Sequence, residues 1–402
     1  MFRKSKKVSI LLICIILLTG CNAYEAPSSF IASPKLSTEE GKNAYGNVNM
    51  EDLKPLAQKF MPKNAKLLEE SKTSTKKNIF LIDVNGDLND ELVVLFKEDS
   101  NFKKGFFVLE KRFNGWHKIY EKSLEGNSIS SMQTISVKDK EDKRLLVGYL
   151  ISGHAGTDFY LYDFKKENVE EIPIGRWNKI EILNTEDKEE GKNFVFGAQL
   201  YEASGDYSSY VIGFDGEKFY LAEEFYDDYY KKNVEYYKNE IVQQSRNELS
   251  WYYYIESQIK AKQYEDALQS LKEVLKYKED KKEESTIEVG YYKFLILRAM
   301  AFNGLGEYDK AVSILENLLN ISLLSDKDYF YNEPKEYSVL DIYYELGVAY
   351  KGLGKKDKAK EAFDNAMLSF EKLSNDGFFS ENATSNILKQ VMYYPLSKEI
   401  NK

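Results

Sequence analysis

The chain has 402 residues, of which 43% are hydrophobic and 30% charged, so it is long enough for two or three domains with apolar cores. The Asp and Glu residues number 65 and the Lys and Arg residues 56, which gives a formal net charge of -9 at pH 7. Because proteins bind nucleic acids mainly through basic surfaces, this balance argues against a nucleic acid as the main partner.

The first 20 residues have the organisation of a secretory signal. Four basic residues within the first seven positions precede an apolar run at 8–18, which is shorter than the ~20 residues of a membrane-spanning helix. Residues 18–21, LTGC, resemble the bacterial lipobox, whose cysteine is lipidated after cleavage just before it. The resemblance implies a lipid anchor at Cys21 on the extracytoplasmic face of the cell membrane. The other cysteine, Cys14, lies in the signal, so the mature chain is expected to contain no disulfide.

Two short segments separate the signal from the first repeats. Residues 21–49 contain Pro27 and Pro34 and show no sustained periodicity, which indicates a flexible tether. Residues 50–76 are expected to form a helical lead-in, with a short helix over 52–60 that ends before Pro62.

Between residues 77 and 228 the apolar residues change to an alternating pattern, and similar groups of strands recur about every 50 residues. The first strands of three units are expected at 92–95, 145–148 and 194–197, the second strands at 106–110, 159–163 and 210–214, and the third strands at 116–120, 169–174 and 218–222. The pattern predicts three antiparallel, propeller-blade-like units. Since a closed propeller normally starts from about four blades, an open or partial stack of blades is the alternative.

An acidic loop, DVNGDLNDE at 83–91, stands just before the first of these strands. It resembles the calcium loop of FG-GAP and related VCBS-like β-repeats, because oxygen donors at alternate positions let a tight loop surround a hard cation. The resemblance implies the following ligands for a structural Ca²⁺: Asp83, Asn85, Asp87, Asn89 and Glu91. Leu88 stands where the family has glycine, and the same residue types also form ordinary hairpin turns. A calcium site and a metal-free turn both stay open at this point.

The clearest helical pattern lies at 341–370. Its apolar and small residues follow helical spacing on both sides of a turn at Gly354, and they include Leu346, Gly347, Tyr350, Ala359, Phe363 and Ala366. These positions resemble the packing positions of the tetratricopeptide repeat. Two less complete copies precede it, one with Gly306 in the turn and one with Lys262 in that place. The resemblance implies a helical solenoid over 229–402, with a capping helix over 380–392 that ends before Pro395.

The sequence offers little for catalysis. The chain has two histidines, His117 and His154, in different repeat units, and the motifs G-x-S-x-G, H-E-x-x-H and the P-loop do not occur. The pattern S-x-x-K occurs at 74–77 and 257–260, but without the partner motifs of penicillin-binding proteins. We therefore expect no enzymatic activity.

In the tetratricopeptide family the first helix of each hairpin lines a concave surface. The positions that correspond to this surface here are Tyr252, Ile259, Ile296, Met300, Asn303, Tyr344, Val348 and Lys351. Glu256, Asp341 and Glu345 lie on the same predicted face and would repel a peptide carboxylate. The groove is therefore expected to take an apolar or aromatic segment of a partner.

Together these patterns predict an α+β multidomain protein, in which an antiparallel β-repeat domain precedes an all-α solenoid similar to tetratricopeptide repeats. The predicted function is a lipid-anchored scaffold that binds a protein or peptide at the cell envelope. The alternative is a carbohydrate-binding or cell-wall-binding protein that uses the β-repeats as its ligand site and the solenoid as a spacer.

Overall fold

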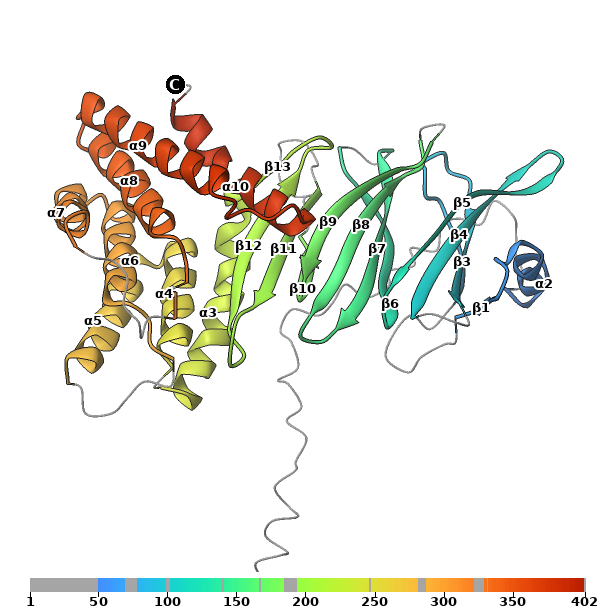
Figure 1. Cartoon of the computed structure of the whole chain (residues 1–402), viewed down its shortest axis with the longest axis horizontal. Helices are drawn as coiled ribbons and strands as arrows, with labels where there is room; N and C mark the ends of the chain where they lie inside the picture. The colour runs from blue at the N-terminus through green and yellow to red at the C-terminus, as the bar shows by residue number, and fades with distance from the viewer. Residues whose placement is uncertain are drawn as a thin grey trace, which may run out of the picture. The chain divides into compact units, whose positions relative to one another are not determined.

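The computed structural model describes residues 50–68, 78–98, 102–138, 141–165, 168–183, 194–245, 247–280, 287–321, 329–330 and 332–400 (Figure 1). The predicted signal, Cys21 and the tether lie outside these residues. The described part begins with α2 (Met50–Phe60), which matches the helix expected at 52–60.

The first sheet contains β1 (Ala65–Leu67), β2 (Ile79–Ile82), β3 (Glu91–Glu98), β4 (Lys103–Arg112) and β5 (Gly115–Glu125). The second contains β6 (Ser128–Ser136), β7 (Lys143–Ser152), β8 (Gly156–Asp163) and β9 (Glu170–Trp177), and the third β10 (Lys179–Ile182), β11 (Phe194–Tyr201), β12 (Tyr207–Phe214) and β13 (Phe219–Leu221). All neighbouring strands are antiparallel. The expectation of three antiparallel units is confirmed, and the described strands close into neither a barrel nor a propeller.

The first sheet has two strands more than the sequence predicted, and the second and third sheets have one more each. The predicted runs correspond to the last three strands of each sheet, and the missed strands are β1, β2, β6 and β10. The strand β1 lies within the lead-in at 50–76 that was expected to be helical. The strands β2 and β10 have only four residues each, and β6 has the sequence SISSMQTIS, which is rich in serine. Short or polar strands carry a weak pattern, because the neighbouring strand supplies most of their stabilisation.

The sheets pack face to face in layers (Figure 1). The helix α2 covers the outer face of the first sheet with Leu53 and Ala57. Between the first and second sheets, the rings of Phe106 and Tyr162 meet edge to face at 5.1 Å. Trp177 and Phe196 belong to the apolar layer between the second and third sheets. Because both faces of the middle layers are buried, the strands are apolar along most of their length, which made them visible in the sequence.

The helical part starts with η1 (Glu223–Phe225) and α3 (Tyr226–Gln243), which covers the free face of the third sheet. Gly197 of β11 makes room for the Tyr229 ring of α3, since a Cβ at this glycine would lie 2.1 Å from the ring. Asp206, in the turn between β11 and β12, accepts hydrogen bonds from Asn247 Nδ2 and Ser250 Oγ, both at 2.8 Å. These contacts hold β12 beside the start of the next helix, α4 (Glu248–Lys260).

Three helical hairpins follow. They are α4 with α5 (Tyr264–Asp280), α6 (Tyr291–Gly304) with α7 (Tyr308–Leu318), and α8 (Lys335–Gly352) with α9 (Lys356–Asn375). Their turns share a left-handed residue, with φ of 58° at Lys262, 74° at Gly306 and 70° at Gly354. Inside the last hairpin, Gly347 faces the ring of Phe363, and a Cβ at this position would lie 2.5 Å from the ring. The small and large positions predicted from the sequence therefore pack against each other.

The last helix, α10 (Ala383–Ile400), corrects one prediction. We expected it to end before Pro395, but the helix continues through this proline to Ile400. Leu396 is 1% exposed in a cluster with Leu340 and Phe370, so packing against α8 and α9 outweighs the hydrogen bond that the proline removes.

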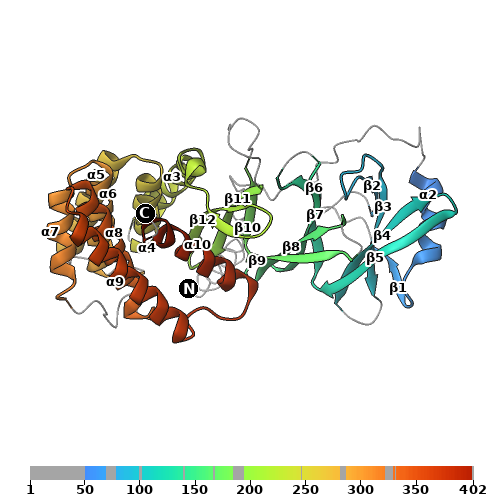
Figure 2. The ribbon, with the colours of Figure 1, turned by 90° about the horizontal axis from the view of Figure 1, so that it is seen from above.

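The helix α10 also returns to the sheets. Its side chains Ile387 and Val391 belong to the apolar core of the second and third sheets. The backbone N–H of Phe219 in β13 donates to Gln390 Oε1 at 3.1 Å. Figure 2 shows α10 lying between α9 and the third sheet. The division of the chain at residue 228 stays a prediction, and α10 contacts elements on both sides of it.

Candidate functional site

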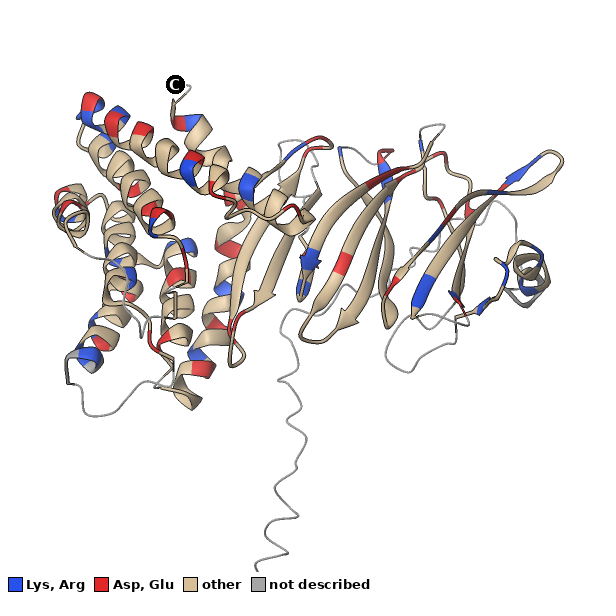
Figure 3. Ribbon diagram, in the orientation of Figure 1, with Lys and Arg blue, Asp and Glu red and all other residues tan. Residues whose placement is uncertain are grey.

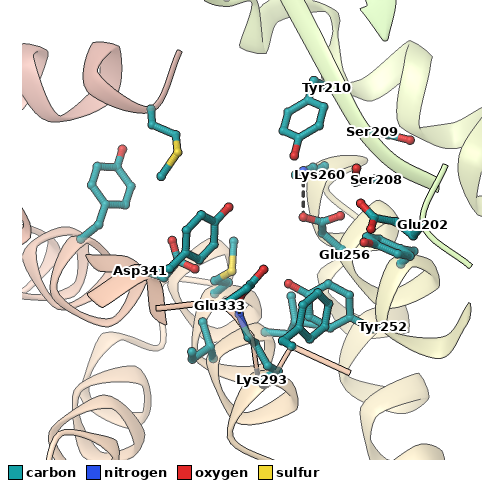
Figure 4. Close-up of a pocket in the computed structure, with 18 of the residues that line it drawn as sticks. Glu202, Ser208, Ser209, Tyr210, Tyr252, Glu256, Lys260, Lys293, Glu333 and Asp341 are labelled. Carbon is teal, nitrogen blue, oxygen red and sulfur yellow. Dashed lines mark hydrogen bonds and ion pairs between the residues drawn. The ribbon is translucent and has the colours of Figure 1, made fainter. Parts of the chain in front are cut away.

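A cavity of about 600 Å³ lies against α4, α6 and α8, the first helices of the three hairpins. The opposite wall is formed by β12, β13, α3 and α10, and residues 329–330 and 332–333 also line the cavity (Figure 4). Its volume falls in the range of ~300–1,000 Å³ that is common for small-molecule sites. The concave face is therefore a partly enclosed cavity at this place, with room for a few side chains or one small ligand.

Tyrosines make up much of the cavity wall. Those that line it within the described ranges are Tyr210, Tyr226, Tyr230, Tyr252, Tyr253, Tyr329, Tyr337 and Tyr344. Tyr252 packs against the ring of Phe330 at 5.3 Å and against that of Phe294 at 6.3 Å. Tyr230 Oη donates to the carbonyl of Ser209 at 2.7 Å. Such a wall offers aromatic faces and hydroxyl groups to the same ligand.

Two lysines lie in this wall, and each is paired with a glutamate. Lys260 Nζ is 2.9 Å from Glu256 Oε1 and 4.9 Å from the ring centre of Tyr230 (Figure 4). Lys293, which is 3% exposed, donates from Nζ to Glu333 Oε2 at 2.7 Å. Its Nζ also lies 4.6 Å from the ring centre of Phe330. In both places a carboxylate and an aromatic ring hold one ammonium group.

Carboxyl groups outnumber ammonium groups in the described part of the lining. Its acidic residues are Glu202, Glu256, Glu333, Asp341 and Glu345. Burial raises the pKa of Asp341 from its ordinary value of 3.8 to about 7, although the charge of Lys293 opposes the rise. Burial also raises the pKa of Glu345 to about 7, despite a 2.7 Å hydrogen bond from Asn303 Nδ2. The cavity therefore holds carboxyl groups whose negative charge is costly to bury, and a cation from a ligand would stabilise their charged form.

The structure separates the eight predicted partner-binding residues into two groups. Tyr252, Ile296, Met300 and Tyr344 line the cavity. The other four take part in packing or pairing within the chain. Ile259 and Val348 pack in apolar clusters, Asn303 donates to the carbonyl of Glu345 at 3.0 Å, and Lys351 pairs with Glu399 of α10.

Sequence reasoning missed the cavity residues that come from outside the inner helix faces. Ser208, Ser209 and Tyr210 come from β12, and Met392 comes from α10. Lys260 and Lys293 are on inner helices, but at the C-terminal end of α4 and in the first turn of α6. The dense tyrosines at 226–254 were the signal in the sequence that could have pointed to this wall.

The outer helices differ in character from the cavity. Figure 3 shows acidic and basic residues mixed along α9. One example is the exposed pair of Lys360 Nζ and Asp364 Oδ2 at 2.9 Å. Exposed pairs of this kind contribute little to stability and keep a surface hydrated, so they offer no focus for a specific ligand.

The acidic loop at 83–91 has a wound conformation. Asp83 Oδ1 accepts from Gly86 N at 2.7 Å, and Glu91 Oε2 accepts from Val84 N at 3.0 Å. Leu88 adopts a φ of 69°, the left-handed conformation that glycine adopts easily, and its side chain is 81% exposed.

The donor set of this loop fits a divalent cation only in part. Buried carboxyl groups at Asp83 and Glu91 favour one, but Lys143 Nζ bonds Asp83 Oδ2 at 3.0 Å and places a positive charge there. Within the described ranges, no group of three or more His, Cys, Asp or Glu residues has an arrangement that would hold a metal ion. Calcium binding at Asp83, Asn85, Asp87, Asn89 and Glu91 stays a prediction.

The histidines and the serine of the S-x-x-K pattern lie apart from the cavity. His117 Nε2 contacts Asn114 Oδ1 at 2.6 Å in an exposed position, and His154 packs against Tyr201 at 5.5 Å. Ser257 is 2% exposed within α4. The second such pattern, at 74–77, falls outside the described residues. The lack of catalysis stays a prediction.

Comparison with protein families finds a tetratricopeptide repeat at residues 340–371, which span most of α8 and α9. The resemblance stated from Gly347 and Phe363 is thus confirmed for this hairpin. No curated protein matches the chain. Among the described helices, none is both long enough and apolar enough to cross a membrane. Tetratricopeptide repeats generally mediate binding to protein partners, so the match supports a role in protein interaction.

Proposed function

We propose that this protein is a lipid-anchored scaffold at the cell envelope that binds a protein partner through the cavity beside α4, α6 and α8. One observation carries the proposal. The cavity lies on the face that tetratricopeptide repeats use for partners, and it is lined by Tyr252, Ile296, Met300 and Tyr344, four of the residues expected to contact a partner.

The shape of the site limits the kind of partner segment. Because β12 and α10 form the opposite wall, the cavity has room for a chain end or a loop with a few side chains. Acidic side chains are disfavoured, since Asp341 and Glu345 already place carboxyl groups in the lining that are costly to charge, and a further carboxylate would add to this cost. The partner therefore inserts neutral, aromatic or basic side chains.

Anchoring supports this role by raising the local concentration of the scaffold at the membrane. Lipidation of Cys21 and a tether over 22–49 would let the folded part reach partners within about 30 Å of the surface. A fatty-acid label incorporated by the wild type, but not by Cys21→Ala, tests this part. Equal labelling of the two chains would contradict it.

The binding proposal is tested by chemical crosslinking on intact cells, with the captured proteins identified by mass spectrometry. We expect one envelope protein to be captured by the wild type and by Leu368→Ala, and to be lost in Met300→Ala. Leu368 is a suitable control because it is 61% exposed on α9, away from the cavity. Capture that is equal in all three chains would contradict a cavity-bound partner.

The alternative, carbohydrate or cell-wall binding by the β-repeats, stays a prediction. Deletion of residues 229–402 is a poor test of it, because the deletion also removes Ile387 and Val391 from the core of the sheets. Binding of the intact chain and of Met300→Ala to purified cell wall is the better comparison. Strong wall binding that both chains share, without a captured protein, would favour the alternative.

A further inference from the structure

We propose that the cavity recognises an alkylammonium group, which is the group that a lysine side chain or a free alkylamine presents. The inference rests on the proposed function, because it names the chemistry of the segment that the cavity would receive. The charges, the aromatic wall and the apolar side of the cavity each favour this group.

Carboxyl groups outnumber ammonium groups by five to two among the described residues that line the cavity. Both ammonium groups, those of Lys260 and Lys293, are already paired with Glu256 and Glu333. Of the remaining three, Glu345 accepts from Asn303 and Glu202 accepts from Tyr329 Oη at 3.1 Å. For Asp341, no hydrogen bond or ion pair is formed with any described residue, and the charge of Lys293 acts on it only from a distance. A cation in the cavity would supply the missing donor.

The cavity already holds ammonium groups that belong to the protein itself. Lys293 is held by one carboxylate and by aromatic rings, with Nζ 4.6 Å from the ring centre of Phe330 and 5.3 Å from that of Tyr337. The Lys260 ammonium has the same type of surroundings, with Glu256 and Tyr230. Asp341 lines the same cavity as Tyr252 and Tyr337. It therefore offers a third carboxyl group among aromatic rings, and no described lysine pairs with it.

One side of the cavity suits the alkyl chain that carries the ammonium group. Ile296, Leu297 and Met300 of α6 line the cavity and give it an apolar side. An alkyl stem can pack along such a side while its charged end meets a carboxylate. Figure 4 shows Glu256, Lys293, Glu333 and Asp341 around one space, so a stem and its charge fit there together. A long, flexible amine is preferred over a compact cation such as Na⁺.

The test uses the purified full chain and three probes of similar size, followed by calorimetry and ligand-observed NMR. The probes are N-acetyl-lysine methylamide, its neutral norleucine analogue and its acidic glutamate analogue. We expect the lysine probe to bind at least about tenfold more tightly than the other two. Norleucine binding as tight as lysine binding, or tighter binding of glutamate, would overturn the inference.

Two pairs of variants tie the binding to the cavity. Asp341→Asn should weaken binding of the lysine probe about tenfold, whereas Asp364→Asn on the outer helix α9 should leave it unchanged. Met300→Lys places an alkylammonium inside the cavity from the protein itself and should abolish probe binding, whereas Met300→Leu should retain it. Retained binding in both Asp341→Asn and Met300→Lys would overturn the inference even if the lysine probe binds.

A fourth probe, 1,5-diaminopentane, separates the two sources of the group. Tighter binding of the lysine amide indicates a protein segment, and tighter binding of the diamine indicates a free amine; either result supports ammonium recognition. The ammonium inference and the scaffold proposal can be contradicted independently of each other. If Met300→Ala loses its crosslinked partner and no amine binds, the ammonium inference is overturned and the scaffold stands.

Discussion

Replacement of Asp341 by asparagine is expected to stabilise the folded protein at neutral and alkaline pH. Burial raises the pKa of this carboxyl from 3.8 to about 7, so the folded chain keeps a proton that the unfolded chain loses between about pH 4 and pH 7. The free energy of unfolding of the wild type therefore falls as the pH rises through this range. Since one pKa unit corresponds to about 1.4 kcal/mol, the penalty above pH 7 is at most about 4 kcal/mol.

Several neighbouring charges set the size of this effect. The groups that act on Asp341 are Lys293 from α6, Glu256 from α4, Glu345 from α8 and Glu333 from the segment before α8. Loss of the negative charge removes an attraction to Lys293 and also removes the repulsion from the three glutamates. Because Lys293 keeps its 2.7 Å pair with Glu333, we expect a net gain of about 1–3 kcal/mol in Asp341→Asn at pH 8.

Urea denaturation followed by intrinsic fluorescence at pH 4, 6 and 8 measures this gain. The advantage of Asp341→Asn over the wild type should be absent near pH 4 and grow towards pH 8. The control Asp364→Asn should differ from the wild type by less than about 0.5 kcal/mol at every pH, because its carboxyl is exposed. A variant that is no more stable than the wild type at pH 8 would contradict the claim that burial of the Asp341 carboxyl disfavours its charged form. It would also contradict the charge distribution described for the cavity.

Three further predictions concern the turns, the helical packing and the acidic loop. Lys262→Gly should raise the free energy of unfolding by about 1 kcal/mol in thermal denaturation, because Lys262 has a φ of 58° and glycine adopts this left-handed conformation without strain. A less stable variant would contradict the turn conformation. Gly347→Ala should lower the free energy of unfolding by about 1–3 kcal/mol, because the new Cβ would lie 2.5 Å from the Phe363 ring. Adding Phe363→Leu to this variant should restore part of the loss. An unchanged stability of Gly347→Ala would show that the Phe363 ring does not lie against Gly347. If the loop at 83–91 binds calcium, millimolar Ca²⁺ should raise the melting temperature more in Lys143→Gln than in the wild type, because this variant lacks the Lys143 ammonium that bonds Asp83. An unchanged melting temperature in both chains would contradict calcium binding.

Local signals were enough to predict the repeats. Gly347 and Phe363 stand at the spacing that brings a small and a large residue together across a helical hairpin, and the structure places them in contact. The strands β3, β7 and β11 were found because they are buried on both faces and therefore apolar throughout. β6 was missed because its serine-rich run becomes a strand mainly by pairing with β7.

The site depends on contacts between residues far apart in the chain, which no local pattern encodes. Phe219 and Gln390 are 171 positions apart, and their hydrogen bond helps to hold α10 beside the third sheet. Tyr210 enters the cavity from a strand, while Met300 enters it from a helix of the solenoid. The helix positions could be inferred from the repeat, and four of the eight inferred residues line the cavity. The wall opposite them could not, because it comes from β12 and α10.

The most direct test of the account is site-specific photocrosslinking at position 300 in living cells. A photoreactive amino acid in place of Met300 lies in the cavity, whereas the same amino acid in place of Leu368 lies on the exposed side of α9. The account predicts a covalent adduct with one protein partner at position 300, none at position 368, and a weaker adduct when Asp341→Asn is added. Adducts of equal strength at both positions, or none at position 300 while binding persists, would contradict the cavity as the partner site.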